Sequence, residues 1–300
     1  MIYNYSLDIF FGLFIFLLGI CLGSFANVLI YRLKNVEQGK RKIVQSRSFC
    51  PHCKHKLGAL DLIPLFSYLF LLGKCRYCRR KISWQYPLVE FAMGILFLLV
   101  FLWSGLSFGD LMLFKLGKLP RLLLGFFVCF VVVVITTYDI LYMEIPDEVM
   151  LPSIVFLFIL SIARSVCSKF DINCVMIDFI YMPSFSNAFI GFLIPVLFFI
   201  FQILLSGGAW IGGGDLRIGA FMGLLLGWQK TLAALALGYS VGAIFGLILI
   251  AIYKRRNKQA VKKSLKLRIP FGPFLGLGTL VSYLYGDWLV YAYVKFLFDY

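Results

Sequence analysis

Long blocks of apolar residues, separated by short polar or basic segments, dominate the chain from one end to the other. A bilayer-spanning helix needs about 20 apolar residues, and most of the blocks approach or exceed that length. They lie at about 9–31, 87–104, 121–140, 148–166, 186–206, 217–228, 230–253 and 272–298. The pattern therefore predicts an all-α polytopic membrane protein with about eight transmembrane helices.

One segment, 33–86, departs from this pattern because it is polar, basic and rich in turn residues. At roughly 50 residues its hydrophobic core would be only marginally stable unless a cross-link such as a bound metal stabilised it. We therefore expect three parts: a first transmembrane helix at 1–32, a small extramembrane insert at 33–86, and a membrane-embedded core at 87–300.

Composition narrows the class of protein further. Hydrophobic residues make up 61% of the chain and charged residues only 14%, whereas a soluble domain carries about 25% charged residues. Such a chain cannot cover a water-exposed surface. A soluble enzyme, a secreted disulfide scaffold and a disordered protein are therefore excluded.

The net charge of +15 is concentrated in two clusters between apolar blocks. Of the 29 Lys and Arg, 13 lie between Arg32 and Lys81 and 8 between Lys254 and Arg268. The positive-inside rule places both clusters in the cytoplasm, where they also face anionic lipid headgroups. With eight spans this orientation puts the N-terminus outside. Topology and lipid contact thus account for the charge, and we expect no nucleic-acid partner.

The insert contains two Cys-x-x-Cys pairs separated by 21 residues. The four cysteines are Cys50, Cys53, Cys75 and Cys78. Two such knuckles supply a closed tetrahedral site of four thiolates, the usual arrangement for structural zinc. A cytoplasmic location argues against disulfides here, and the metal's binding energy would become folding energy. Cys167 and Cys174 fall on the outer side, where a disulfide between them stays open.

Two aspartates stand out because so few acidic residues lie near the apolar blocks. Asp139 ends the run 131–139, and Asp215 follows three glycines. An ionisable group at membrane depth costs about 2.5–3.5 kcal/mol and is functional by default. Both lie at cytoplasmic ends of their spans, so they can meet and share a proton as an acid/base pair. On this basis alone an intramembrane aspartyl hydrolase and a proton-coupled transporter remain open, as do helix-capping roles.

Several segments, taken in order, resemble the bifunctional bacterial type IV prepilin peptidases, which are GxGD aspartyl proteases. The matching segments are 23–33 in the first helix, 48–78 across the cysteines, 82–90, 138–147 with its Tyr-Asp and Ile-Pro-Asp, and 212–217 with Gly-Gly-Gly-Asp-Leu-Arg. The GxGD motif alone is a weak signal. All five segments in one order are highly specific.

The resemblance implies a function in the bacterial inner membrane. Such enzymes cut the leader from type IV prepilins or pseudopilins at the cytoplasmic face, at a Gly-Phe junction, and then methylate the new N-terminus from S-adenosylmethionine. By match of motifs, Asp139 and Asp215 carry proteolysis. Asn27, Arg32 and Glu90 are candidates for cofactor binding, with helix–helix hydrogen bonding as the alternative reading. A GxGD protease without methylation, and a proton- or metal-coupled transporter, are the competing functions.

Overall fold

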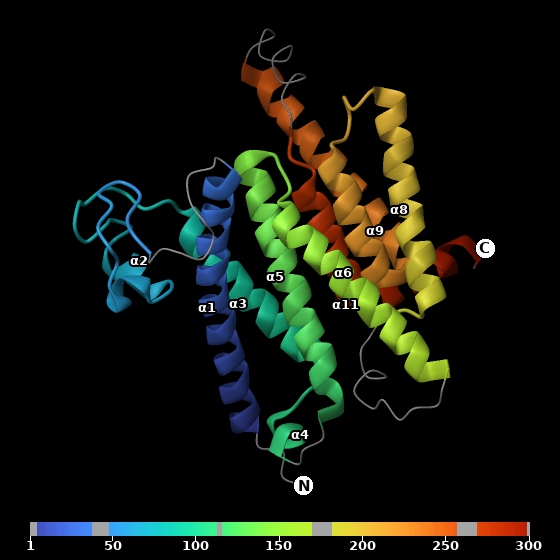
Figure 1. The fold of residues 1–300 in the computed structure, drawn as a ribbon, viewed down its shortest axis with the longest axis horizontal. Helices are drawn as coiled ribbons and strands as arrows, with labels where there is room; N and C mark the ends of the chain where they lie inside the picture. The colour runs from blue at the N-terminus through green and yellow to red at the C-terminus, as the bar shows by residue number, and fades with distance from the viewer. Residues whose placement is uncertain (1–4, 38–47, 113–115, 170–181, 257–268, 299–300) are drawn as a thin grey trace. The chain divides into compact units, whose positions relative to one another are not determined.

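A computed structural model describes residues 5–37, 48–112, 116–169, 182–256 and 269–298 (Figure 1). These residues are almost entirely helical and include no β-strand longer than an isolated bridge. The long helices are α1 (Tyr5–Glu37), α3 (Gln85–Ser104), α5 (Leu119–Tyr142), α6 (Asp147–Lys169), α8 (Phe185–Ser206), α9 (Gly213–Arg256) and α11 (Gly272–Phe298). The short pieces are η1 (Ala59–Leu62), α2 (Phe66–Phe70), α4 (Phe108–Met112) and η2 (Leu116–Lys118). The predicted all-α fold is confirmed.

Six of the described helices are long and apolar enough to cross a membrane. They are Leu7–Asn35, Gln85–Ser104, Leu119–Tyr142, Asp147–Lys169, Phe185–Ser206 and Gly213–Ile252. Many large apolar side chains on them, such as Phe201, Leu204 and Leu247, are exposed, as expected where lipid replaces water as the solvent. The protein is therefore an integral membrane protein.

The predicted count of eight spans is not confirmed. The blocks expected at 217–228 and 230–253 lie in the single element α9, and α11 is helical but not apolar enough to join the six. Within α9, Gly227 departs from helical geometry with φ 73° and ψ 172°. The side chain of Asn187 on α8 accepts a hydrogen bond from the N–H of Trp228 at this break (2.9 Å). The two predicted spans are thus two helical runs that meet at Gly227.

The chain divides into two compact units, Met1–Val134 and Ile135–Tyr300. In the N-terminal unit, α1 packs along α3 over an extended contact. Small residues allow the backbones to approach: a Cβ added to Gly19 would lie 2.9 Å from the Cα of Gly94, and one added to Gly23 would lie 2.7 Å from the Cα of Glu90. Close approach through glycine is the usual way in which helices associate in lipid.

Between α1 and α3 lies the insert, whose described part begins at Ser48. Apart from η1 and α2 it consists of turns and two isolated antiparallel bridges, Phe49 with Lys56 and Lys74 with Lys81. Its core is small, since Cys50 and Cys75 are its buried side chains while Phe70 and Leu72 are each 83% exposed. A fold with so little buried apolar surface needs another source of stability.

In the C-terminal unit, α8, α9 and α11 lie side by side (Figure 1). Gly191 of α8 and Gly223 of α9 meet backbone to backbone, because a Cβ on Gly191 would lie 2.5 Å from the carbonyl oxygen of Gly223. Gly278 of α11 packs in the same way on the backbone of Ala234 in α9. Through these contacts α8 and α11 each pack closely against α9.

Three of the remaining cysteines, Cys21, Cys129 and Cys167, lie in helices. Cys129 is buried and Cys21 exposed, and both are free thiols. Cys167, near the end of α6, takes part in a disulfide, while Cys174 lies outside the described residues. The basic cluster from Lys254 to Arg268 also lies mostly outside them.

Candidate active site and cysteine cluster

Asp139 occupies the last turn of α5, where its side chain is buried. Its Oδ2 accepts a hydrogen bond from the backbone N–H of Gly272, the first residue of α11 (2.8 Å). The chain leaves α5 through a tight turn in which Met143 adopts φ 56° and donates its N–H to the carbonyl of Asp139 (2.8 Å). Both the side chain and the backbone of Asp139 are therefore held.

Asp215 lies in the first turn of α9 and is also buried. Its Oδ2 accepts a hydrogen bond from the N–H of Gly212 (3.3 Å). The carboxyl groups of Asp139 and Asp215 are close enough to interact electrostatically. The structure thus brings the two predicted aspartates together from separate segments. Two buried carboxyl groups that interact electrostatically can divide one proton between them, which suits general acid–base chemistry on a peptide bond.

Two contacts join the segments that carry the aspartates. A Cβ on Gly214 would lie 2.8 Å from the Cδ1 of Ile145, so this glycine lets α9 begin directly against the α5–α6 turn. Asp147, the first residue of α6, forms an ion pair with Arg217 of α9. Glu144, which lies between Asp139 and Asp147 in the sequence, is exposed.

Sequence reasoning missed two residues at this site, Gly272 and Tyr239. The Tyr239 hydroxyl on α9 donates a hydrogen bond to the Oε1 of Gln202 (2.8 Å) and lies within electrostatic range of Asp215. A signal for Gly272 was present, since Pro270-Phe-Gly-Pro273 interrupts the chain just before an apolar block. Nothing in the sequence alone connected that break with Asp139.

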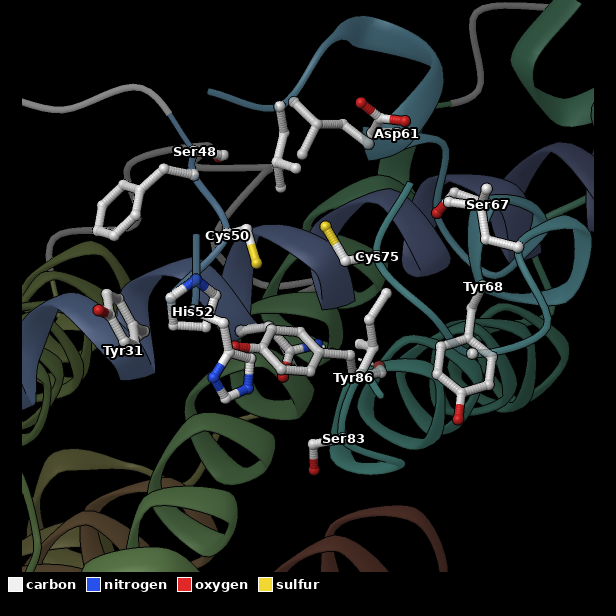
Figure 2. Close-up of a pocket in the computed structure, with 18 of the residues that line it drawn as sticks. Tyr31, Ser48, Cys50, His52, Asp61, Ser67, Tyr68, Cys75, Ser83 and Tyr86 are labelled. Atoms are coloured by element: carbon white, nitrogen blue, oxygen red, sulfur yellow. Dashed lines mark hydrogen bonds between the residues drawn. The ribbon is translucent and has the colours of Figure 1, made fainter. Parts of the chain in front are cut away.

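The four cysteines of the insert converge on one point. Their Sγ atoms all lie within 4.8 Å of one another, with 3.9 Å between Cys50 and Cys78. Zinc–sulfur bonds of about 2.3 Å in a tetrahedron place the sulfurs about 3.8 Å apart. The side chains of Cys50 and Cys75 point toward each other at the centre of the insert (Figure 2). The donor set therefore fits a tetrahedral metal ion.

Both knuckles are built in the same way. In each, the residue after the second cysteine has positive φ, 57° at Lys54 and 58° at Arg79. That residue donates its N–H to the carbonyl of the first cysteine, at 2.8 Å for Lys54 and 3.0 Å for Arg79. The first cysteine in turn donates its N–H to the backbone carbonyl five residues later, which belongs to His55 in the first knuckle and to Arg80 in the second. The two halves are thus structurally equivalent, although the sequence shows no obvious repeat.

The thiols differ in how readily they ionise without a metal. Burial opposes ionisation of Cys50, but the N–H groups of Cys53 and His52 outweigh it and lower the pKa of this thiol to about 7. The N–H of Arg80 favours the Cys78 thiolate, yet burial and the neighbouring cysteines raise the pKa of Cys78 to about 11. Four thiolates do not form together unless a cation neutralises them, because a coordinating metal deprotonates its thiols.

Asp61, in η1, forms hydrogen bonds to the second knuckle. It accepts hydrogen bonds from the N–H of Gly58 (3.1 Å), the Nε of Arg76 (2.6 Å) and the hydroxyl of Tyr77 (3.1 Å). Burial opposes its ionisation, but these three donors outweigh burial and lower the pKa of Asp61. The carboxylate thereby ties the second knuckle to the middle of the insert.

A cavity of about 1580 Å³ opens within the N-terminal unit, between α1, the insert and the start of α3 (Figure 2). The three residues predicted to bind a cofactor, Asn27, Arg32 and Glu90, all line it, together with several aromatic side chains. Those aromatic residues include Tyr31, Tyr68, Trp84 and Tyr86.

Asn27 and Glu90 also form hydrogen bonds that connect parts of the N-terminal unit. Asn27 donates a hydrogen bond to the carbonyl of Tyr86 (3.1 Å) and accepts one from Gln85 (3.4 Å). Glu90 accepts the N–H of Leu65 (2.8 Å), a residue held at φ 59°. These contacts fasten α1 and the insert to α3, so Asn27 and Glu90 help to shape the cavity that they line.

Two family models match the chain. The bacterial peptidase A24 N-terminal domain matches residues 17–104, and the type IV leader peptidase family matches residues 126–247. The first match covers α1 from residue 17 onward, the insert and α3. The second covers the segments that carry Asp139 and Asp215.

Relatives match over nearly the full length. The prepilin leader peptidase/N-methyltransferase of Aeromonas hydrophila is 31% identical over 91% of this chain and 90% of the relative. The protein of the same name from Bacillus subtilis is 30% identical over 94% of this chain and 97% of the relative. No solved structure matches the chain significantly. Since identity at this level spans both ends of the chain and both functional clusters, the protein is an enzyme of the prepilin leader peptidase/N-methyltransferase family.

Proposed function

We propose that the protein removes the leader peptide of type IV prepilins or pseudopilins and then N-methylates the new N-terminal residue. Membership of the family supports both activities. The observation that carries the proteolytic part is that Asp139 and Asp215, two buried carboxyl groups from distant segments, lie within electrostatic range of each other. A proton- or metal-coupled transporter would move ions across the membrane, whereas a protease cleaves peptides without ion flux.

The geometry supports aspartyl chemistry at this pair. One carboxylate accepts a proton from a water molecule, whose oxygen attacks the scissile carbonyl carbon. The partner carboxyl group donates its proton to the carbonyl oxygen. Buried in the unit, the pair is shielded from bulk water, which strengthens each of these interactions.

The methyl donor is proposed to bind in the cavity of the N-terminal unit. S-adenosylmethionine supplies a methyl group carried on a sulfonium centre. The volume of about 1580 Å³ is ample for a nucleoside with an amino-acid side arm. Aromatic walls such as Tyr31 and Trp84 suit stacking on the adenine and contact with a cation, and Arg32 suits the donor's carboxylate.

Zinc is proposed for the four cysteines. All four positions of a tetrahedron are filled by Cys50, Cys53, Cys75 and Cys78, so no open position remains for substrate or water. This supports a structural role, in which the metal holds the insert against α1 and α3.

We further propose that the protein lies in the bacterial cytoplasmic (inner) membrane with its N-terminus outside and 33–86 and the active site at the cytoplasmic face. In this topology, 1–32 forms the first transmembrane helix, 33–86 the cytoplasmic insert and 87–300 the membrane-embedded core. Its support is the distribution of basic residues, which follows the positive-inside rule. The same residues would contact anionic lipids, and no nucleic acid is invoked.

Proteolysis is tested by co-expression with a prepilin carrying a Gly-Phe junction, with the product N-terminus read by mass spectrometry. Asp139→Asn and Asp215→Asn should each abolish cleavage at unchanged protein levels, because Asn keeps the shape but cannot exchange the proton. Asp287→Asn is the matched control. Cleavage surviving in either variant would overturn the assignment and direct attention to Asp147 and Glu144.

Methylation is read from the same spectra as the added mass of one methyl group. Arg32→Ala should lower methylation while cleavage persists, and an increase in the KM for the donor would locate the effect in binding. A wild-type product that is cleaved but never methylated would favour the alternative, a GxGD protease without methyltransferase activity.

A further inference from the structure

The start of α11 makes a direct contact with the aspartate pair. The Gly272 N–H donates to the Oδ2 of Asp139 at 2.8 Å in a buried setting. The two residues are 133 positions apart in the chain, so this bond is a consequence of the packing of the C-terminal unit and not of local turn geometry.

The contact requires glycine. A Cβ at position 272 would lie 2.6 Å from the Oδ2 of Asp139 and 3.1 Å from its Cγ. The atoms in the way belong to the carboxyl group itself and cannot swing aside without breaking the hydrogen bond. Any larger residue would therefore displace the carboxyl group of Asp139 from its present position.

The electrostatics of this contact favour a carboxylate at Asp139. The first N–H groups of a helix have no partner within the helix and carry the positive end of its dipole. α11 is 27 residues long and has no acidic residue in its first turn. Asp215 also lies at a helix start, in the first turn of α9, but the bond it accepts is longer, 3.3 Å from the N–H of Gly212. The two carboxyl groups therefore have unequal surroundings.

The same segment also reaches toward Asp215. The ring of Phe271 packs edge-on against Tyr239 at 4.9 Å, and Tyr239 lies within electrostatic range of Asp215. Asp139 thus has a titratable neighbour in Asp215, and Asp215 has a second one in Tyr239, while Asp147 pairs with Arg217. Gly272 thus contacts Asp139 directly, and Phe271 contacts Tyr239, a neighbour of Asp215.

We propose that residues 270–273 form a third segment of the proteolytic site, in which Gly272 is a positioning residue that holds Asp139 as the carboxylate. This rests on the proposed function. It assigns Asp139 as the base and Asp215 as the acid.

The assignment gives a balanced reaction. Water loses a proton to Asp139 as its oxygen bonds to the carbonyl carbon, and Asp215 gives its proton to the carbonyl oxygen. When the carbon–nitrogen bond breaks, Asp139 returns its proton to the leaving amine. One hydroxyl proton of the intermediate passes to Asp215, so both residues regain their starting states.

The test uses full-length protein in detergent and a synthetic peptide with a basic leader, a Gly-Phe junction and an apolar segment. Gly272→Ala should lower kcat by about 10- to 100-fold with little change in KM, as expected for a small misplacement of a reacting group. It should also move the acid limb of the kcat–pH profile to higher pH. Gly246→Ala, where a Cβ would meet open space, is the matched control.

Each other outcome overturns the proposal in a distinguishable way. Wild-type kcat in Gly272→Ala would show that the amide does not matter. A lower kcat with both limbs unmoved would reduce Gly272 to a structural residue. Movement of the alkaline limb alone would reverse the acid and base roles. Activity in Asp139→Asn would instead defeat the proposed function.

A second measurement covers the case in which Gly272→Ala does not fold. In wild-type protein with isotope-labelled glycine, the amide resonance of Gly272 should shift with pH in parallel with the acid limb. The shift should vanish in Asp139→Asn. An amide resonance that ignores pH in the wild type would overturn the proposal without any substitution at Gly272.

Discussion

The cysteine cluster and the aspartate pair are assembled in opposite ways. Cys50 and Cys78, the outermost ligands of the cluster, are only 28 residues apart, and each knuckle closes its own backbone hydrogen bonds. The aspartate pair is gathered from the ends of long helices, and its Asp139 is held by an amide 133 residues away. The first site is local and the second is a product of helix packing.

This difference predicts different weaknesses. The cluster has little apolar core, so it should depend on its ligand and on charges within the insert. The aspartate site has rigid walls of closely packed helices, so it should depend on small residues where segments touch. Four experiments test this difference between the two sites.

Removal of the metal should have the largest effect, and it should be confined to the insert. Structural zinc contributes about 10–16 kcal/mol in small metal-dependent folds, far more than the exposed insert can gain from its own packing. Cys50→Ser or chelation should abolish metal content and expose the insert to proteolysis, while Cys21→Ser should change neither. A metal-free insert that resists protease would break the comparison.

At the aspartate site, substitutions of Gly213 and Gly214 should differ sharply in their effect on the cleavage rate. Gly214→Ala should lower cleavage about 10- to 100-fold, because its Cβ would meet Ile145 and shift the carboxyl group. Gly213→Ala should stay near the wild-type rate, since a Cβ there meets nothing within 4 Å. Adding Ile145→Ala should restore part of the activity of Gly214→Ala. Equal effects at both glycines would contradict the steric reading.

Asp61 should stabilise the insert in a pH-dependent way. Because the pKa of Asp61 is lowered in the folded state, its contribution is fully present above the unfolded value of about 3.9 and is lost as pH falls through the folded value. Asp61→Asn should therefore cost about 1–3 kcal/mol at pH 7, and less in strong acid. Protease sensitivity of the insert across pH measures this, with Asp110→Asn as control. An unchanged insert at pH 7 would be the contrary result.

The smallest effect is expected at the ion pair of Asp147 with Arg217. Both side chains are partly exposed, at 45% and 35%, and such pairs contribute about 0–1 kcal/mol. Asp147→Arg and Arg217→Asp should each slow cleavage by up to about fivefold, and the double exchange should recover the rate. A double variant slower than either single one would show that the pair does not join the two segments.

What could be predicted from the sequence follows the same division. The Cys-x-x-Cys spacing placed all four ligands correctly in one cluster, because each knuckle is formed by adjacent residues. The apolar blocks located the helices, because the hydrophobicity of a segment depends only on its own residues and not on how the helices pack. The meeting of Asp139 and Asp215 was predicted from topology, which needs only the side of the membrane on which each helix ends.

Features that depend on packing were not predictable in this way. Gly227 breaks α9 into two helical runs without a polar loop, so no polar residue marked where the first predicted block ends and the second begins. Gly272 is separated from Asp139 by 133 residues, and no local rule connects a glycine to a carboxylate so far away. The contacts of Asn27 and Glu90 with Tyr86 and Leu65 likewise exist only once α1, the insert and α3 have packed.

The bond between Gly272 and Asp139 also has a consequence for timing during synthesis. At about 5–20 residues per second, the ribosome delivers Gly272 roughly 7–27 seconds after Asp139, since 133 residues separate them. Through that interval the nascent chain carries its carboxyl group without the amide that holds it. A chain that stops before Ile269 should therefore insert without cutting anything. The protease would become active only with its last helix, so unfinished copies would leave other membrane proteins intact.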